Sequence, residues 1–165
     1  MSETPLFLIT RLLGISGSIF LSGFAFSASF YSTPAISLAP LPLRLQQWQV
    51  IYDLGKLVSP PLSVATGIAW GSAAWIAKGS ASGGEEWKLY AVTAAATFGV
   101  LAWTLGAMMG TNLELLRMAK AAREDSGSKM LVGAEKAVAT WNWMNYVRAV
   151  IPMVGAWVGI YAALK

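Results

Sequence analysis

The chain has 165 residues, of which 56% are hydrophobic and only 12% charged, and its formal net charge is +4. A soluble domain carries about 25% charged residues, and a chain of this length could not hide so much apolar surface from water, which excludes an ordinary soluble protein and indicates one integral membrane domain. The absence of Cys and His excludes disulfides, thiolate nucleophiles and the commonest metal ligands.

The first apolar stretch covers residues 6–31, and Arg11 is its one charged residue. A transmembrane helix needs about 20 residues, whereas the apolar region of a signal peptide has about 7–15. We therefore predict a retained transmembrane helix. The small residues between Gly14 and Gly23 indicate close contacts with neighbouring helices.

The segment after this span is rich in proline. Residues 33–42 contain three prolines, each of which removes a backbone donor and restricts the preceding residue, so we expect a link rather than a continuous helix. Residues 43–56 follow, with apolar side chains at helical spacing and polar ones largely elsewhere. This pattern predicts an amphipathic helix at the membrane interface that leads into the second span.

The second and third spans are predicted at residues 57–77 and 87–110. Pro60 and Pro61 lie near the start of the second span. This position is compatible with a helix, because the first turn of a helix tolerates proline. A short polar turn with three glycines separates the two spans. The helical pattern of the third continues past residue 110 with charged residues on it, so we expect this extension to leave the membrane.

The fourth span is predicted at residues 141–164, in a helix that starts near Lys129 after a break at residues 126–128. The fold class is therefore all-α: residues 1–165 form a single membrane four-helix bundle. Four spans place both termini on one side. Lys and Arg are more frequent in the two loops on the other side, which favours a cytoplasmic position for those loops. Basic residues beside apolar segments are typical of membrane flanks, so we expect lipid and no nucleic acid as a partner.

Polar residues within apolar spans need an explanation. Trp141, Asn145, Arg148 and Pro152 occur at i, i+4, i+7 and i+11, which places them on one helix face. Either Arg148 bonds an acid or backbone carbonyls and holds the bundle together, or it lies in a polar pocket and stabilises developing negative charge. The same two alternatives apply to Asn145 and to Asn112, near the end of the third span.

Other side chains are candidates for the same region. Trp48, Tyr52 and Trp141 either form an aromatic belt at the membrane interface or line such a pocket. Asp53 and Glu114 are the carboxylates nearest to the spans, and each is either a partner of Arg148, a base or a solvated group.

Known cofactor motifs are missing from the sequence. It contains no phosphate-binding glycine loop, dinucleotide fingerprint, nucleophile elbow or zinc signature. If the chain is an enzyme, we therefore expect it to work without a bound metal or nucleotide cofactor, on an apolar substrate that reaches it from the bilayer. A small transporter is disfavoured, because paired ionisable residues are few within the spans.

Taken in chain order, these residues resemble the anthrone oxygenase-like family, which comprises small four-helix membrane proteins, many of them fungal and encoded with polyketide pathways. The resemblance covers nearly the whole chain and is carried by the order and spacing of short motifs. The residues concerned are Pro34, Trp48, Tyr52, Gly55, Pro60, Thr111, Asn112, Leu115, Trp141, Asn145 and Arg148.

The resemblance implies a monooxygenase of the endoplasmic reticulum membrane. It would oxidise an anthrone-type aromatic polyketide to an anthraquinone with O2 and without a cofactor. Such a reaction needs a base, a partner for an oxyanion and a dry apolar slot. By this resemblance, Arg148, Asn145 and Asn112 hold the oxyanion, and Trp48, Tyr52 and Trp141 line the slot.

The catalytic base stays open, because the chain has no His. The base is Tyr52, Asp53 or Glu114, or else the chain has no activity alone. The alternative function is therefore a non-catalytic partner subunit that scaffolds or stabilises a related catalytic membrane oxygenase. Either a homo-oligomer or a hetero-oligomer with a related membrane protein is compatible with these functions.

Overall fold

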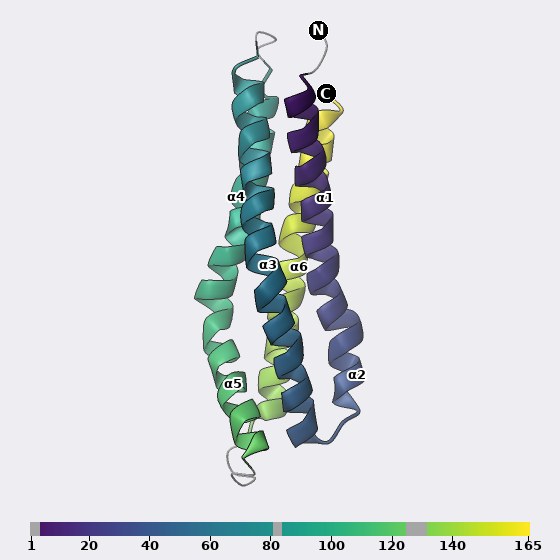
Figure 1. Ribbon diagram of the computed structural model, residues 1–165, viewed down its shortest axis with the longest axis vertical. Coiled ribbons are helices and arrows are strands. Elements are labelled where there is room, and N and C mark those ends of the chain that lie inside the picture. Colours follow the sequence, from purple (N-terminus) through teal and green to yellow (C-terminus); the bar gives the residue numbers. More distant parts are fainter. Residues whose placement is uncertain (1–3, 81–83, 125–131) are drawn as a thin grey trace.

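A computed structural model describes residues 4–80, 84–124 and 132–165. Figure 1 shows an elongated bundle in which long helical runs pass up and down beside one another. Within the described ranges there are four such runs, which confirms the all-α class. They are α1 (Pro5–Ser27) with the π-helix η1 (Ala28–Ser32) and α2 (Thr33–Ser37); α3 (Leu41–Lys78); α4 (Glu86–Trp103) with the π-helix η2 (Thr104–Met108) and α5 (Met109–Arg123); and α6 (Ala134–Ala163).

The runs form a closed ring of antiparallel neighbours. α1 packs against α3 and α6, and α4 packs against the same two helices from the other side. Figure 1 shows both termini at one end of the bundle and the link from α2 to α3 at the opposite end, as the sequence predicts for four passes of the chain.

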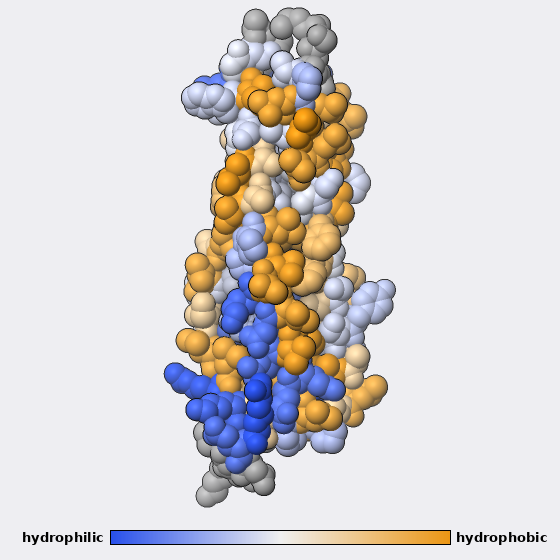
Figure 2. Space-filling model, in the orientation of Figure 1, coloured by the Kyte–Doolittle hydropathy of each residue, from blue (hydrophilic) through white to orange (hydrophobic). Residues whose placement is uncertain are grey.

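The surface of the bundle is suited to lipid. Among the described residues, the runs Pro5–Ser37, Glu86–Arg123 and Ala134–Ala163 are long and apolar enough to cross a membrane, and large side chains such as Phe20 and Trp157 are exposed. Figure 2 shows hydrophilic residues gathered toward one end of the visible face and apolar residues over most of the rest. The chain is therefore a membrane protein. α3 is not among these three runs but packs along α1 and α4, so the assignment of its residues 57–77 as the second span stays a prediction.

The first run is longer than the sequence predicts, because Thr33–Ser37 is helical where a proline-rich link was expected. The turn before Pro34 is π-helical: the Thr33 N–H donates to the Ala28 carbonyl, and Thr33 Oγ1 donates to the same oxygen at 2.9 Å. A wider turn lets the helix pass a proline, which has no N–H of its own. The link shrinks to residues 38–40.

The amphipathic segment 43–56 is helical, as expected, but it continues without a break into the second predicted span. Both belong to the 38-residue helix α3, so Pro60 and Pro61 lie inside a helix rather than in a first turn. Leu45 and Trp48 are fully buried in a cluster with residues of α5 and α6. The segment runs along the bundle and not along the membrane surface, because its apolar side packs against protein rather than against lipid headgroups.

The third run extends to Arg123 as one helical stretch, which confirms the predicted helical extension beyond residue 110. The expected break at residues 126–128 and the helix start near Lys129 lie outside the described residues. α6 begins at Ala134, directly after Gly133, whose φ of 83° lies in the left-handed region that glycine adopts readily.

Candidate functional site

A cavity of about 370 Å³ lies between the helices, within the range of about 300–1,000 Å³ typical of small-molecule sites. All four runs contribute to it, and so do both π-helices. Its lining consists of Phe24, Ser27, Ala28 and Ser32 from the first run; Ile51, Tyr52, Leu54, Gly55, Lys56, Ser59, Pro60 and Ser63 from α3; Val100, Leu101, Thr104, Leu105, Met109 and Asn112 from the third run; and Trp141 and Arg148 from α6.

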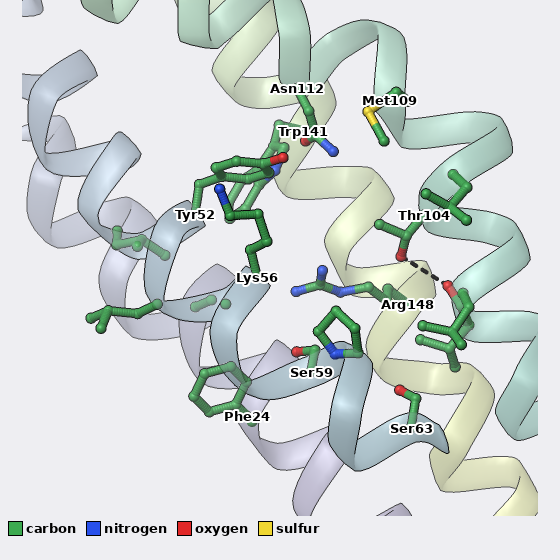
Figure 3. Close-up of a pocket in the computed structure, with 18 of the residues that line it drawn as sticks. Phe24, Tyr52, Lys56, Ser59, Ser63, Thr104, Met109, Asn112, Trp141 and Arg148 are labelled. Carbon is green, nitrogen blue, oxygen red and sulfur yellow. Dashed lines mark hydrogen bonds between the residues drawn. The ribbon is translucent and has the colours of Figure 1, made fainter. Parts of the chain in front are cut away.

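Arg148 is the cation on the α6 side of this pocket. Figure 3 shows its guanidinium reaching across the cavity toward α3, beside Ser59. Its Nε is buried without a hydrogen-bond partner, and within the described part of the chain no hydrogen bond or ion pair to Arg148 is found. A guanidinium keeps its charge at neutral pH, and a buried charge is stabilised only when it is paired. The pocket therefore offers an unneutralised site for an anion.

Asn112 and Tyr52 occupy the other end of the pocket, away from Arg148 (Figure 3). Asn112 is 2% exposed, and its side-chain oxygen is buried without a partner. The Tyr52 ring stacks on Trp48 with a centroid distance of 5.3 Å, and its hydroxyl lies on the same side of the pocket as the Asn112 amide. Arg148 and the pair of Tyr52 and Asn112 thus lie at different ends of the pocket, which suits a ligand with oxygens at opposite edges.

The aromatic wall has two layers. Trp141 lines the cavity, and Trp48 packs against it edge to face, with ring centroids 5.7 Å apart. Trp48 is fully buried and does not line the cavity. It therefore fixes Trp141 and Tyr52 in place, and a flat ligand would contact those two rings.

Asn145 shares the inner face of α6 but does not line the pocket. Its Nδ2 donates to the carbonyl of Ala25 and to Ser29 Oγ, both at 2.8 Å. Asn145 therefore ties α6 to the first run, which is the helix-holding alternative for this residue.

The carboxylates named by the sequence lie elsewhere. Asp53 is about half exposed and pairs with Lys56 at 3.4 Å on the surface of α3, and Glu114 is exposed. Neither lines the pocket, and no other Asp or Glu occurs among its described lining residues. The site is therefore cationic overall, since both Arg148 and Lys56 belong to it.

Sequence reasoning missed the contribution of α3 below Tyr52. Tyr52, Lys56, Ser59 and Ser63 all line the cavity, and they occur at i, i+4, i+7 and i+11. This spacing is the one that singled out the inner face of α6, so the same test applied to α3 would have found them. The two π-helices that border the pocket could not be predicted in this way, because the spacing of apolar residues does not distinguish a π turn from an α turn.

The arrangement can bind a flat apolar molecule and stabilise negative charge on its oxygen. Arg148 supplies a preorganised positive charge beside aromatic walls, and Tyr52 is a side chain of the described lining that can accept a proton as its phenolate. Among the residues described, no three Asp or Glu side chains gather in a group that could hold a metal ion.

Comparison with known proteins gives concordant matches. The sequence model of a family described as anthrone oxygenase matches residues 48–158, a range that contains every candidate site residue. A monooxygenase, hypC, of Dothistroma septosporum is 34% identical over 94% of this chain and 83% of its own length. The anthrone oxygenase encC of Aspergillus fumigatus is 28% identical over 94% of this chain and 93% of its own.

A noranthrone monooxygenase of Aspergillus flavus is 28% identical over 92% of this chain and 71% of its own length. The matches therefore extend over most of both chains rather than over one shared motif. No solved structure matches this chain.

Proposed function

Because the chain belongs to the anthrone oxygenase family, we propose that it oxidises an anthrone-type aromatic polyketide to the corresponding anthraquinone with O2. Relatives named anthrone oxygenase and noranthrone monooxygenase support this reaction class. The observation that carries the assignment to a site is the pocket beside Arg148, where an unneutralised guanidinium faces aromatic walls.

The reaction requires no group beyond the substrate, O2 and a base. The methylene opposite the anthrone carbonyl loses a proton, and the resulting anion is an aromatic phenolate with its negative charge largely on the carbonyl oxygen. This anion passes one electron to O2, and the two radicals combine to form a peroxide at the former methylene carbon. Loss of water from that peroxide leaves the second carbonyl, so one O2 gives one quinone and one water. We propose on this basis that the enzyme works without a cofactor.

Each end of the pocket has a role in this scheme. Arg148 holds the oxygen on which negative charge develops, which lowers the energy of the anion. The opposite edge of the ring system, which carries the methylene, then lies toward Tyr52 and Asn112. Tyr52, as its phenolate, is the candidate proton acceptor, and Asn112 offers its free side-chain oxygen to a hydroxyl or to the peroxide proton.

Substrate entry from the bilayer is part of the proposal. Leu54 and Leu105 line the pocket and are 56% and 64% exposed, which supports an opening of the cavity at the side of the bundle. An apolar polyketide dissolved in lipid would enter there. We place the enzyme in the endoplasmic reticulum membrane by analogy with the family resemblance.

The test uses the purified chain in lipid nanodiscs with an anthrone as substrate, and it measures quinone formation and O2 uptake together. We expect both rates to exceed spontaneous oxidation in empty nanodiscs, with one O2 consumed per quinone. Rates equal to the spontaneous ones would reject the chain as an enzyme on its own. Activity that appears only after co-expression with a related oxygenase would instead support the partner-subunit function.

A further inference from the structure

The pocket contains two positive side chains and lacks a negative one among the residues described. Arg148 and Lys56 both line it, whereas Asp53, the partner of Lys56, does not. The reaction proposed above creates one oxyanion at a time, and Arg148 suffices for that charge. In the described residues Lys56 pairs with Asp53, whose carboxylate does not line the pocket, so a negative group of the ligand could take the place of Asp53.

Lys56 is held only weakly where it stands. Its ammonium lies 3.4 Å from Asp53, with 63% and 47% of the two side chains exposed, and such exposed pairs contribute about 0–1 kcal/mol. The same ammonium sits 5.6 Å from the centroid of the Tyr52 ring. Lys56 can therefore turn to a ligand at little cost.

The two cations lie at different depths. Figure 3 shows the end of the Lys56 side chain beside the Tyr52 ring and the Arg148 guanidinium farther along the pocket, and both residues line this one cavity. Arg148 Nε is sealed from solvent, whereas Lys56 is largely exposed. A negative group bound by Lys56 would stay partly hydrated. Such a site suits a group of the substrate that is always ionised, whereas the oxyanion that forms only during the reaction lies at Arg148.

We propose that the natural substrate carries a carboxylate on its aromatic ring system, and that Lys56 binds this carboxylate at the pocket mouth while Arg148 holds the reacting oxygen. This inference rests on the proposed function for the identity of the ring system. A carboxyl group with an ordinary pKa of about 4 is ionised at neutral pH, whereas a phenol with a pKa of about 10 is not. Lys56 is thus a specificity-determining residue.

The test measures binding without turnover. The quenching of tryptophan fluorescence by anthraquinone-2-carboxylate and by unsubstituted anthraquinone gives two dissociation constants for the chain in nanodiscs. We expect the carboxylate to bind about tenfold more tightly than the neutral quinone, in line with one charge-assisted hydrogen bond. The variant Lys56→Gln should remove this preference, and Lys56→Arg should retain it.

Lys120→Gln is the matched control, because Lys120 is an exposed lysine on α5 outside the pocket. It should keep the wild-type preference for the carboxylate. Equal binding of the two quinones by the wild type, or an undiminished preference in Lys56→Gln, would overturn the inference.

A kinetic comparison separates this inference from the proposed function. With an anthrone carboxylate as substrate, Lys56→Gln should raise KM and leave kcat nearly unchanged, while the KM for the neutral anthrone stays the same. If the chain oxidises neither anthrone but Lys56 still governs carboxylate binding, the proposed function fails and the binding site stands. If both anthrones are oxidised with no dependence on Lys56, the binding inference fails and the function stands.

Discussion

Tyr52 and Lys56 lie one turn apart on α3 and have different roles in the proposed site. Both line the pocket, but the Lys56 ammonium cannot accept the proton that the anthrone methylene loses, whereas a tyrosine phenolate can. Lys56 has its ammonium near the mouth, whereas the Tyr52 hydroxyl points into the cavity beside Asn112 (Figure 3). The geometry thus favours Tyr52 as the base and leaves Lys56 for substrate recognition.

Replacing Tyr52 with Phe should therefore lower kcat by about 10²-fold or more, the usual contribution of a positioned acid–base group. The ring remains, so its stacking on Trp48 and the quinone dissociation constant should change little. Steady-state kinetics with an anthrone, together with quinone binding, measure both effects. A kcat equal to that of the wild type would remove Tyr52 from the mechanism.

Asn145 illustrates how a polar residue on the inner face can serve structure instead of chemistry. Both hydrogens of its amide nitrogen bond to the first run. Asn145→Ala leaves the buried Ala25 carbonyl and Ser29 hydroxyl without this donor, and each lost partner costs about 1–3 kcal/mol. We expect a lower thermal midpoint but an unchanged kcat in the folded fraction. A variant with full stability and lost activity would return Asn145 to the catalytic group.

At the scale of elements, helix contacts in the terminal half of the bundle depend on glycine. Trp70 is fully buried and donates to Ser18 Oγ at 3.0 Å. A Cβ added at Gly14 would lie 2.6 Å from the Trp70 ring, and one at Gly159 would lie closer still. These glycines therefore let α1 and α6 approach α3 around a large ring, as small residues do in membrane helix pairs.

Gly14→Ala and Gly159→Ala should each destabilise the bundle, by about 1–3 kcal/mol for overpacking. Gly71→Ala is the control, because a Cβ there meets nothing within 4 Å, and alanine is the better helix former by about 1 kcal/mol. Thermal unfolding in detergent measures all three. Equal midpoints for Gly159→Ala and Gly71→Ala would contradict the packing around Trp70.

The helices themselves could be predicted from the sequence, because apolar stretches of sufficient length and turn residues mark them. The inner face of α6 also followed from spacing, and Trp141 and Arg148 do line the pocket. The uninterrupted course of α3 could not be predicted from the sequence. Pro60 and Pro61 suggest a helix start in isolation, and only the burial of Leu45 and Trp48 against α5 and α6 shows why the helix runs through them.

The sequence singled out Asp53 as a site residue, but Lys56 lines the pocket instead, for a related reason. The sequence draws attention to the carboxylate because a base was sought, yet helix geometry turns Asp53 to the surface and lets Lys56 line the cavity. The π-helices η1 and η2 border the same pocket, and π turns occur frequently at functional sites. Their widening depends on tertiary packing, so periodicity cannot reveal them.

At the scale of the whole molecule, the bundle has one markedly hydrophilic end (Figure 2), and both termini lie together at one end (Figure 1). We predict that the loops opposite the termini are cytoplasmic, since they hold more Lys and Arg. The chain has no Cys, so single cysteines placed at Ser37 and at Ser80 give a clean labelling test in microsomes. A membrane-impermeant maleimide should label the first site in sealed vesicles and the second only after permeabilisation. The reverse pattern would invert the topology.

The central claim is that the charge of Arg148 stabilises the anion from which O2 takes an electron. The most direct measurement is the rate of quinone formation by Arg148→Ala in nanodiscs, beside Arg117→Ala, which removes an exposed arginine of α5 outside the pocket. Loss of one such stabilising group typically lowers kcat by about 10²–10³-fold, and we predict that loss for Arg148→Ala and wild-type kcat for Arg117→Ala. An Arg148→Ala variant that folds and turns over at the wild-type rate would contradict the account.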